Sequence, residues 1–218
     1  PCQSPPVRYL ADRLMAESTP LEFPQSGFEG LIFDLDDTLV NSMPLHFRAW
    51  CAALELHGSP GVFPEDVFYA MGGRPTKDIV AILNGEHGLN MDPTAVALAK
   101  RDAFLAEVGT VSVIAEVSEF ARSWYGKVPL AVATGGTQVV AEKTLQAVGL
   151  SELFDEVVTS DDVKCGKPAP DIFLEAARRL GVAPEKCVAL EDAPSGIMAA
   201  QSAGMEVVVI PAPVGVCR

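Results

Sequence analysis

"LIFDLDDTLV", residues 31–40, joins an apolar run directly to three carboxylates, those of Asp34, Asp36 and Asp37. An uncompensated charge at the edge of a hydrophobic core is costly, and it forces either protonation or the presence of a partner. Carboxylates in such a place are therefore usually held by a cation or by a hydrogen-bond network. The rest of the sequence is expected to supply that partner.

The apolar run before Asp34 is one of five similar segments. They are short, rich in Val, Leu and Ile, and mostly without polar alternation, which is typical of strands buried on both faces. Helical patterns near 137–148, 170–180 and 194–203 separate the later ones. This alternation predicts right-handed crossovers and an α/β fold, an open, doubly wound parallel sheet of the Rossmann-like type. The five predicted strands are 30–36, 128–134, 155–160, 186–192 and 206–210.

One interval interrupts this alternation, because residues from about 43 to 108 contain only helical patterns. It directly follows the first strand, so it would lie over the carboxyl edge of the sheet, where open α/β folds bind ligands. We therefore expect an all-helical cap inserted after the first strand. The expected division is an N-terminal arm (1–27), an α/β core (28–42 and 109–218) and the helical cap (43–108). The proline-rich arm is expected to dock or to stay detached, with a trimmed targeting segment as the weaker alternative.

The chain is acidic, with a formal net charge of −13. Nucleic acids and anionic membranes would be repelled, so neither is expected as a partner. The longest run without a charged side chain, 128–141, contains Pro129 and two adjacent glycines, so no membrane span is expected. Five widely spaced cysteines without a CxxC pair disfavour a disulfide framework and a zinc site. A cytoplasmic location is expected, with an organellar stroma or matrix as the alternative; the oligomeric state stays open, with a monomer favoured.

Polar side chains stand where several of the predicted strands end. Because the carboxyl ends of parallel strands lie along one edge of a sheet, residues that are distant in sequence can meet there. The residues in question are Asp34 and Asp36 after the first strand, Thr134 with Gly135 and Gly136 after the second, Lys167 beyond the third, and Glu191 with Asp192 at the end of the fourth.

Together these groups have the composition of a phosphoryl site. Nearby carboxylates cannot all stay ionised without a cation, and an all-oxygen set of ligands suits Mg²⁺. Asp34 and Asp36 are spaced i and i+2, so in an extended strand both would face the same ligand. Lys167 adds a positive charge, and the donors at 134–136 precede a predicted helix, a favourable place for an anion. The expected partner is therefore a small phosphorylated substrate.

Each of these residues also has a purely structural interpretation. A single acid after a strand is more often a helix cap or a turn residue, and Lys167 alone would be a surface lysine. Asp161 and Asp162 are interpreted in this way, as solvated loop acids. For the set as a whole the structural interpretation is weak, because chance would have to place a suitable group at nearly every strand end.

Four ordered motifs carry a resemblance to a known family: "DLDDT" (34–38), "VATGGT" (132–137), "KPAPDIF" (167–173) and "LEDAPSGI" (190–197). They resemble the motifs of the haloacid dehalogenase superfamily over about residues 28–212. More narrowly, the chain is similar to the β-phosphoglucomutase-like branch, whose helical cap follows the first motif. Within that branch it resembles the fructose-1-phosphate/6-phosphogluconate-type sugar phosphatases.

The resemblance implies a role for each residue of the motifs. Asp34 would be the nucleophile that forms an aspartyl-phosphate, and Asp36 the general acid and base. Mg²⁺ would be held by Asp34, by the backbone carbonyl of Asp36 and by Asp192, with Glu191 organising the site. The groups that would bind the phosphoryl oxygens are Thr134, Lys167 and the amides of Gly135 and Gly136.

The cap offers three further candidates, since His46, Arg74 and Lys100 match substrate-proximal positions of related enzymes. Their structural interpretation is a polar helix residue for His46 and solvated surface charges for the other two. Asp37 departs from the family pattern, which usually has Gly there, but Asp tolerates a left-handed backbone better than most residues.

The expected function is that of a Mg²⁺-dependent phosphatase acting on a small sugar phosphate through an aspartyl-phosphate. A sugar phosphomutase is the nearest alternative, because it would use the same aspartyl-phosphate and return the phosphoryl group to another hydroxyl. An alternative of another class is a non-catalytic regulator or scaffold that kept the fold. The complete set of motif residues speaks against it, and the sequence does not identify the sugar.

Overall fold

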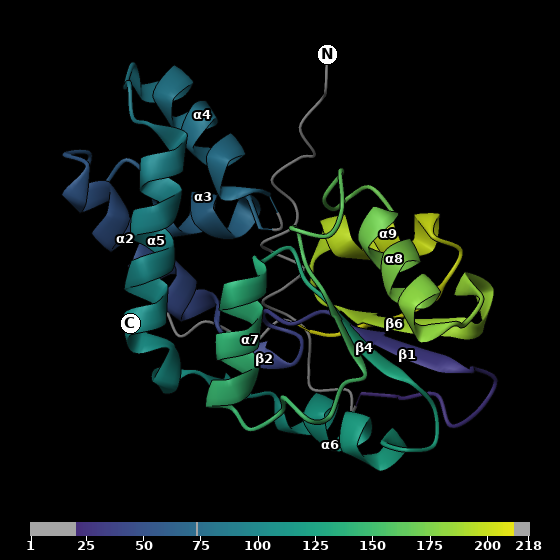
Figure 1. Cartoon of the computed structure of the whole chain (residues 1–218). Coiled ribbons are helices and arrows are strands. Elements are labelled where there is room, and N and C mark those ends of the chain that lie inside the picture. The colour runs from purple at the N-terminus through teal and green to yellow at the C-terminus, as the bar shows by residue number, and fades with distance from the viewer. Residues whose placement is uncertain (1–20, 73, 212–218) are drawn as a thin grey trace.

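The computed structural model describes residues 21–72 and 74–211 of the chain. Its centre is a five-stranded parallel sheet with the order β5-β4-β1-β6-β7 (Figure 1). This confirms the predicted doubly wound α/β fold. Among the described helices, none combines the length and the apolar character that crossing a bilayer requires. The strands are β1 (Gly30–Phe33), β4 (Leu130–Ala133), β5 (Glu156–Val158), β6 (Cys187–Glu191) and β7 (Glu206–Val209).

The first strand ends earlier than the sequence predicts, at Phe33. Asp37 adopts a left-handed backbone conformation with φ 58°, and its N–H donates to the carbonyl oxygen of Val40 at 2.7 Å. Asp34 is thus the first residue beyond β1, and Asp36 lies in the loop between the end of β1 and this turn. The extended-strand argument for Asp34 and Asp36 therefore does not hold. The expectation that Asp tolerates a left-handed turn at position 37 is confirmed.

Helices cover both faces of the sheet, which explains why the strands lack polar alternation. Leu31 and Phe33 are fully buried against α6 (Ala115–Trp124) and α7 (Gln138–Ala147). Ile32 points to the opposite face, where it packs with α8 (Asp171–Leu180) and α9 (Pro194–Ser202). Figure 1 shows these two pairs of helices on opposite sides of the strands. A short 3₁₀ turn, η2 (Pro184–Lys186), leads into β6.

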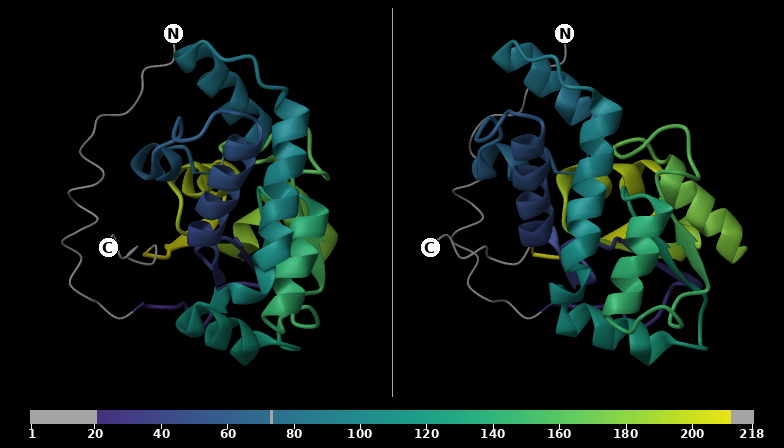
Figure 2. Two further views of the ribbon diagram at one scale, coloured as in Figure 1. Left: turned by 90° about the vertical axis from the view of Figure 1, so that its left-hand side faces the viewer. Right: turned by 60° about the vertical axis from the view of Figure 1, so that its left-hand side comes forward.

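Residues between β1 and α6 form a separate helical layer, as the sequence pattern indicates. Its helices are α2 (Met43–Leu56), α3 (Glu65–Ala70), α4 (Thr76–His87) and α5 (Pro93–Glu107), followed by the 3₁₀ turn η1 (Val108–Thr110). Trp50, Phe63 and Phe68 belong to a hydrophobic cluster confined to this layer. Helices α2 and α5 run side by side (Figure 2).

The helical layer is joined to the sheet through two very short strands. They are β2 (Val40–Asn41) and β3 (Ser112–Val113), which pair in antiparallel orientation. The N–H of Ile114 also donates to the carbonyl oxygen of Leu39 at 2.9 Å. The chain thus enters and leaves the helical layer at one place. That the layer is a separate cap domain with the boundaries given above stays a prediction.

Part of the expected arm packs against the core. Phe23 stacks on Phe120 of α6 with ring centroids 4.4 Å apart, and Phe28, the first residue of the expected core, meets Trp124 edge-on at 4.7 Å. Leu21 packs against the same hydrophobic cluster. Residues 1–20 of the expected arm lie outside the described residues.

Candidate active site

The site begins with a buried ion pair between residues that are 133 positions apart. Lys167 Nζ lies 2.6 Å from Asp34 Oδ1 and 2.7 Å from Glu191 Oε1, and it also donates to the carbonyl oxygen of Ala133 at 3.0 Å. The three charged residues are 6%, 7% and 1% exposed for Asp34, Lys167 and Glu191. Asp34 directly follows β1 and Glu191 ends β6, the neighbouring strand. The predicted convergence of these residues at one sheet edge is thus present.

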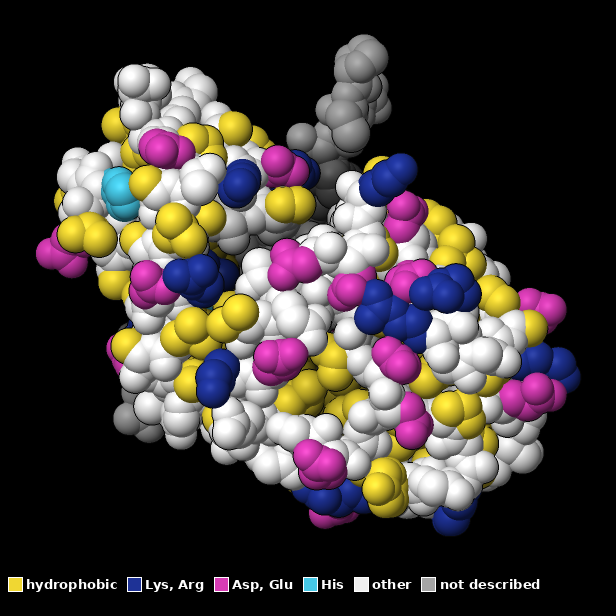
Figure 3. Space-filling model, in the orientation of Figure 1, with side chains coloured by type: hydrophobic (Ala, Val, Ile, Leu, Met, Phe, Trp, Pro, Cys, Tyr) yellow, Lys and Arg dark blue, Asp and Glu magenta, His cyan; other side chains and the backbone are white. Residues whose placement is uncertain are grey.

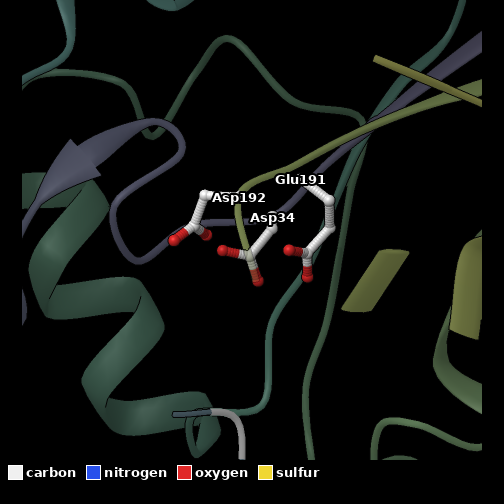
Figure 4. Close-up of side chains that lie close together, drawn as sticks. All are labelled: Asp34, Glu191 and Asp192. Atoms are coloured by element: carbon white, nitrogen blue, oxygen red, sulfur yellow. The ribbon is translucent and has the colours of Figure 1, made fainter. Parts of the chain in front are cut away.

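Asp192 completes an acidic group with Asp34 and Glu191. One carboxylate oxygen from each residue lies within 4.8 Å of the other two. Figure 4 shows the three carboxylates in a row, with Asp34 between Asp192 and Glu191. Asp192 Oδ1 also accepts a hydrogen bond from the hydroxyl of Thr38 at 3.2 Å. The loop after β1 therefore contacts the end of β6 from two positions.

The electrostatics of this group are unfavourable for three ionised acids. Burial raises the pKa of Asp34 well above its ordinary value, although the ammonium of Lys167 opposes the shift. Burial and the neighbouring Glu191 raise the pKa of Asp192 to about 7. For Lys167 the effect of burial is outweighed by Asp34 and Glu191, so its pKa lies above the ordinary range and the side chain stays charged.

The residues present fit a divalent cation. Three carboxylates face one ammonium, which leaves two negative charges that one divalent ion would neutralise. The donors are all oxygens, the ligand type that hard cations prefer. Asp34 Oδ2 has no hydrogen-bond partner among the described residues, so it is free to bind a ligand or to react.

The Asp36 carboxylate is held apart from this group, on the side of the helical layer. Its Oδ1 accepts a hydrogen bond from the hydroxyl of Ser42 at 2.5 Å and lies 3.0 Å from His46 Nε2. Burial alone would raise the pKa of Asp36, but His46 and Ser42 outweigh it and the pKa lies below its ordinary range. The side chain of Asp36 is thus not among the clustered acids. Its expected role as a metal ligand rests on its backbone carbonyl and stays a prediction.

His46 is a buried residue at the start of α2. Its ring stacks on Phe104 of α5 with centroids 4.1 Å apart and 17° between the planes. Burial lowers the pKa of His46, and the nearby Lys100 lowers it further, while Asp36 opposes both. A neutral ring that donates from Nε2 leaves Nδ1 as an acceptor, and Nδ1 is buried without a partner among the described residues.

The other two cap candidates differ in their surroundings. Lys100 is half-buried on α5, with its Nζ 6.0 Å from the centre of the Trp50 ring. Burial lowers the pKa of Lys100 to about 8, against the opposing effect of Asp36. Arg74 is exposed, and its side chain forms no salt bridge within 21–72 and 74–211. The structure therefore brings His46 and Lys100 towards Asp36 and leaves Arg74 at the surface.

Thr134 follows β4 and is fully buried. The N–H of Gly136 donates to Thr134 Oγ1 at 3.0 Å. Because the hydroxyl oxygen already accepts this bond, its own hydrogen is available to donate to an anion. Gly135, between the two, is exposed. The predicted grouping of residues 134–136 is present, and α7 begins two residues later, at Gln138.

A neighbouring loop supports the turn at 134–136, and the sequence interpretation missed it. Ser160 donates to the carbonyl oxygen of Gly136 through both its N–H and its hydroxyl, each at 3.0 Å. Asp161 Oδ2 accepts from the N–H of Gln138 at 2.9 Å, at the start of α7. The signal that could have indicated this is the run "TSDD" directly after a strand, since such residues often cap backbone donors.

Asp162 also has partners that the sequence interpretation did not give it. Its Oδ2 accepts from the N–H and the hydroxyl of Thr159 at 2.8 and 2.9 Å, and its Oδ1 pairs with Arg179 of α8. These hydrogen bonds, with Arg179, lower the pKa of Asp162 despite the opposing effect of burial. Asp161 and Asp162 are thus exposed, as expected, but they brace the loop that leads to Lys167.

The surface around the site carries mixed charges. On the face shown in Figure 3, Lys and Arg side chains are interspersed with Asp and Glu and do not gather in one patch. Within the described residues, the buried Lys167 contacts the acidic group, and Lys100 acts on Asp36, on the cap side.

Comparisons with known proteins agree with this geometry. The sequence model of the haloacid dehalogenase-like hydrolases matches residues 28–204. The fructose-1-phosphate phosphatase YqaB of Escherichia coli is 38% identical over 181 residues, which are 83% of this chain and 95% of that protein. A phosphorylated carbohydrates phosphatase of Thermotoga maritima is 35% identical over 182 residues, 82% of each protein.

Solved structures give the same result. The CbbY protein of Rhodobacter sphaeroides in complex with xylulose-(1,5)bisphosphate has a TM-score of 0.76 and 26% identity, over 83% of this chain and 84% of that chain. A putative β-phosphoglucomutase of Thermotoga maritima has a TM-score of 0.59 and 33% identity, over 82% and 83%. The chain therefore belongs to the haloacid dehalogenase-like hydrolases and is a phosphatase of that family.

Proposed function

We propose that the protein is a Mg²⁺-dependent phosphomonoesterase that hydrolyses a small sugar phosphate through an aspartyl-phosphate on Asp34. The observation that carries the proposal is the buried group at the sheet edge, in which Asp34 contacts Lys167 and shares an acidic cluster with Glu191 and Asp192. In Asp34, Oδ1 is held by Lys167 and Oδ2 has no hydrogen-bond partner among the described residues, so Oδ2 is suited to attack a phosphorus atom. The named phosphatases among the relatives support the reaction class.

In the first proposed step, Asp34 Oδ2 attacks phosphorus and the bond from phosphorus to the sugar oxygen breaks. Lys167 holds Asp34 Oδ1, so the attacking oxygen is oriented by an existing contact at 2.6 Å. The hydroxyl of Thr134 would donate to a phosphoryl oxygen, because its own oxygen already accepts from Gly136. The leaving sugar oxygen takes a proton from Asp36.

In the second step, water attacks phosphorus, Asp36 accepts its proton, and inorganic phosphate and free Asp34 are released. Beside His46 and Ser42 the pKa of Asp36 lies below its ordinary range, so the carboxylate is ionised and has a free site for the proton of the water. To act as the acid of the first step, Asp36 must bind a proton. If the Asp36 carboxylate leaves Ser42 and His46 in a site closed to water, it loses the two hydrogen bonds that stabilise its charged form. Burial then raises the pKa of Asp36, so that it can bind the proton.

Divalent-metal use is general among haloacid dehalogenase-like hydrolases, and the acidic cluster fits such an ion. When bound, Mg²⁺ would supply positive charge next to the phosphoryl oxygens. Asp34 and Asp192 would be its side-chain ligands, with the backbone carbonyl of Asp36. Glu191 accepts from Lys167 and from the N–H of Ala193 at 2.7 Å, so we assign it the organisation of the site.

The substrate class rests on the relatives and on the cap. Their printed names include fructose-1-phosphate, hexitol and phosphorylated-carbohydrate phosphatases. On the cap side, Lys100 and His46 lie near Asp36, where the sugar part of a substrate would sit. A half-buried lysine and an imidazole acceptor are suited to hydroxyl groups and to a phosphate.

The test is phosphate release from a panel that contains fructose 1-phosphate, a hexitol phosphate, 6-phosphogluconate and a generic aryl phosphate. We expect release with Mg²⁺, loss of release with EDTA, and recovery when Mg²⁺ is added back. No release from any member with Mg²⁺ would refute the phosphatase proposal. Release that is indifferent to EDTA would refute the metal part alone.

A sugar phosphomutase is the second candidate, because a putative β-phosphoglucomutase is among the structural relatives. The two reactions share the aspartyl-phosphate and differ in whether water or a sugar hydroxyl accepts the phosphoryl group. A mutase requires priming by a sugar bisphosphate and conserves phosphate. Phosphate release without any bisphosphate therefore favours the hydrolase, and bisphosphate-dependent isomer formation without release favours the mutase.

A further inference from the structure

Gly196 lies in the first turn of α9, directly against the carboxylate of Glu191. A Cβ built on Gly196 would lie 1.6 Å from Glu191 Oε1, 2.1 Å from Cδ and 2.7 Å from Oε2. Heavy atoms do not approach so closely without bonding. The Glu191 carboxylate therefore occupies the space that any side chain at position 196 would need.

Glu191 has no room to move away from such a side chain. It is 1% exposed, its Oε1 accepts from Lys167 at 2.7 Å, and its Oε2 accepts from the N–H of Ala193 at 2.7 Å. Each carboxylate oxygen of Glu191 thus has its own hydrogen-bond partner, and the carboxylate lies directly against Gly196. Displacement of the carboxylate would break its bond to Lys167, which in turn holds Asp34.

The backbone of Gly196 does not itself require glycine. Its φ is not among the positive values of this chain, so alanine could adopt the same conformation. Glycine is also less favourable than alanine within a helix, so it is a costly choice in a first turn without another reason. The contact with Glu191 is such a reason.

We propose that Gly196 is a positioning residue for the metal site. Because it has no side chain, the Glu191 carboxylate fits beside it, in the place from which it holds Lys167, and Lys167 in turn holds Asp34. This rests on the function proposed above and extends it to a residue that touches neither substrate nor metal. The contact is steric, so the effect of a methyl group at position 196 should depend on the length of the side chain at position 191.

The experiment is a double-mutant cycle with Gly196→Ala and Glu191→Asp. Mg²⁺ is titrated into each purified protein by calorimetry without substrate, and thermal unfolding is measured separately in EDTA. In the wild-type background, Gly196→Ala should weaken Mg²⁺ binding by at least about 10-fold, as expected when a residue that orients metal ligands is disturbed. In the Glu191→Asp background the same substitution should weaken it by less than about 3-fold, because the shorter side chain leaves room for the methyl group.

Gly85→Ala is the matched control, because Gly85 lies within α4 and a Cβ there would meet nothing within 4 Å. It should leave Mg²⁺ binding unchanged. Equal losses from Gly196→Ala in the two backgrounds, or no loss in either, would overturn the proposal. If Gly196→Ala fails to fold, the proposal requires that Glu191→Asp restores folding, and failure in both backgrounds overturns it. A wild-type protein that binds no Mg²⁺ refutes the metal part of the proposed function instead. Thermal unfolding in EDTA then decides on Gly196, because Gly196→Ala must lower the midpoint more in the wild-type background than in the Glu191→Asp background.

Discussion

Removal of the Lys167 ammonium should destabilise the metal-free protein in a pH-dependent way. Lys167→Met replaces the aliphatic part of the side chain at similar length but leaves Asp34 and Glu191, both almost fully buried, without their shared cation. Breaking a buried ion pair from one side costs about 3–5 kcal/mol of the free energy of unfolding. Two acids lose their partner here, so the loss at pH 8 should lie in the upper part of that range.

The loss should shrink as the pH falls. Burial already raises the folded-state pKa of Asp34, and the Lys167 ammonium opposes that shift, so without Lys167 this pKa rises further and the folded variant binds more protons than the folded wild type. Stability therefore increases with falling pH, by about 1.4 kcal/mol per pH unit for each group that titrates between its unfolded and folded pKa. Relative to wild type, Lys167→Met should lose no more than about 2 kcal/mol at pH 5.

The assay is urea unfolding in EDTA at pH 8 and pH 5, followed by circular dichroism. Lys164→Met is the control, because Lys164 is exposed on the same loop. It should change the free energy of unfolding by less than about 0.5 kcal/mol at either pH. If Lys167→Met is as stable as this control at pH 8, or if its loss is the same at both pH values, the buried ion pair does not carry the stability assigned to it.

Four further outcomes test the site. Asp34→Asn should lower the turnover number by at least about 10³-fold with unchanged circular dichroism, and turnover near the wild-type value would exclude Asp34 as nucleophile. Burial raises the pKa of Asp192 to about 7, so protons should compete with Mg²⁺ and calorimetry should find binding about 5-fold weaker at pH 6 than at pH 7; equal affinities would contradict this. Lys100→Met should raise KM for the sugar phosphate. The wild-type KM should also rise above pH 8, because Lys100 loses its proton there, and the variant should not show this rise. Ser160→Ala removes one hydrogen bond to Gly136, so the inhibition constant for inorganic phosphate should rise about 5-fold, equivalent to about 1 kcal/mol, and an unchanged constant would show that the loop does not position the phosphate donors.

The fold was predictable because burial on both sheet faces leaves a clear sequence pattern. The runs before Asp34 and Glu191 are apolar without alternation, and helices do cover both of their faces. The convergence of Asp34, Lys167 and Glu191 followed from one topological rule, that parallel strands end at the same edge. Nothing about side-chain conformation was needed for it.

The details of the site were not predictable, because they depend on contacts that leave no periodic signal. The Asp36 side chain contacts Ser42 and His46 and lies apart from the acidic cluster, whereas the i, i+2 spacing had suggested that it shares one ligand with Asp34. The steric role of Gly196 is visible only when Glu191 is in place. A glycine within a helix turn is the weak sign that could have drawn attention to it.

The paired strands β2 and β3 make the helical layer exchangeable in principle. Both crossings of the chain lie in one ribbon, with Val40 opposite Val113 and Asn41 opposite Ser112. If another helical segment replaced the residues between these two pairs, the pairing of β2 with β3 would fix the distance between its ends. The sheet edge with Asp34 and Glu191 would be unchanged. Under the proposed function, chemistry and substrate choice would then be encoded in separate stretches of the chain, and new specificities could be sought by exchanging the helical layer alone.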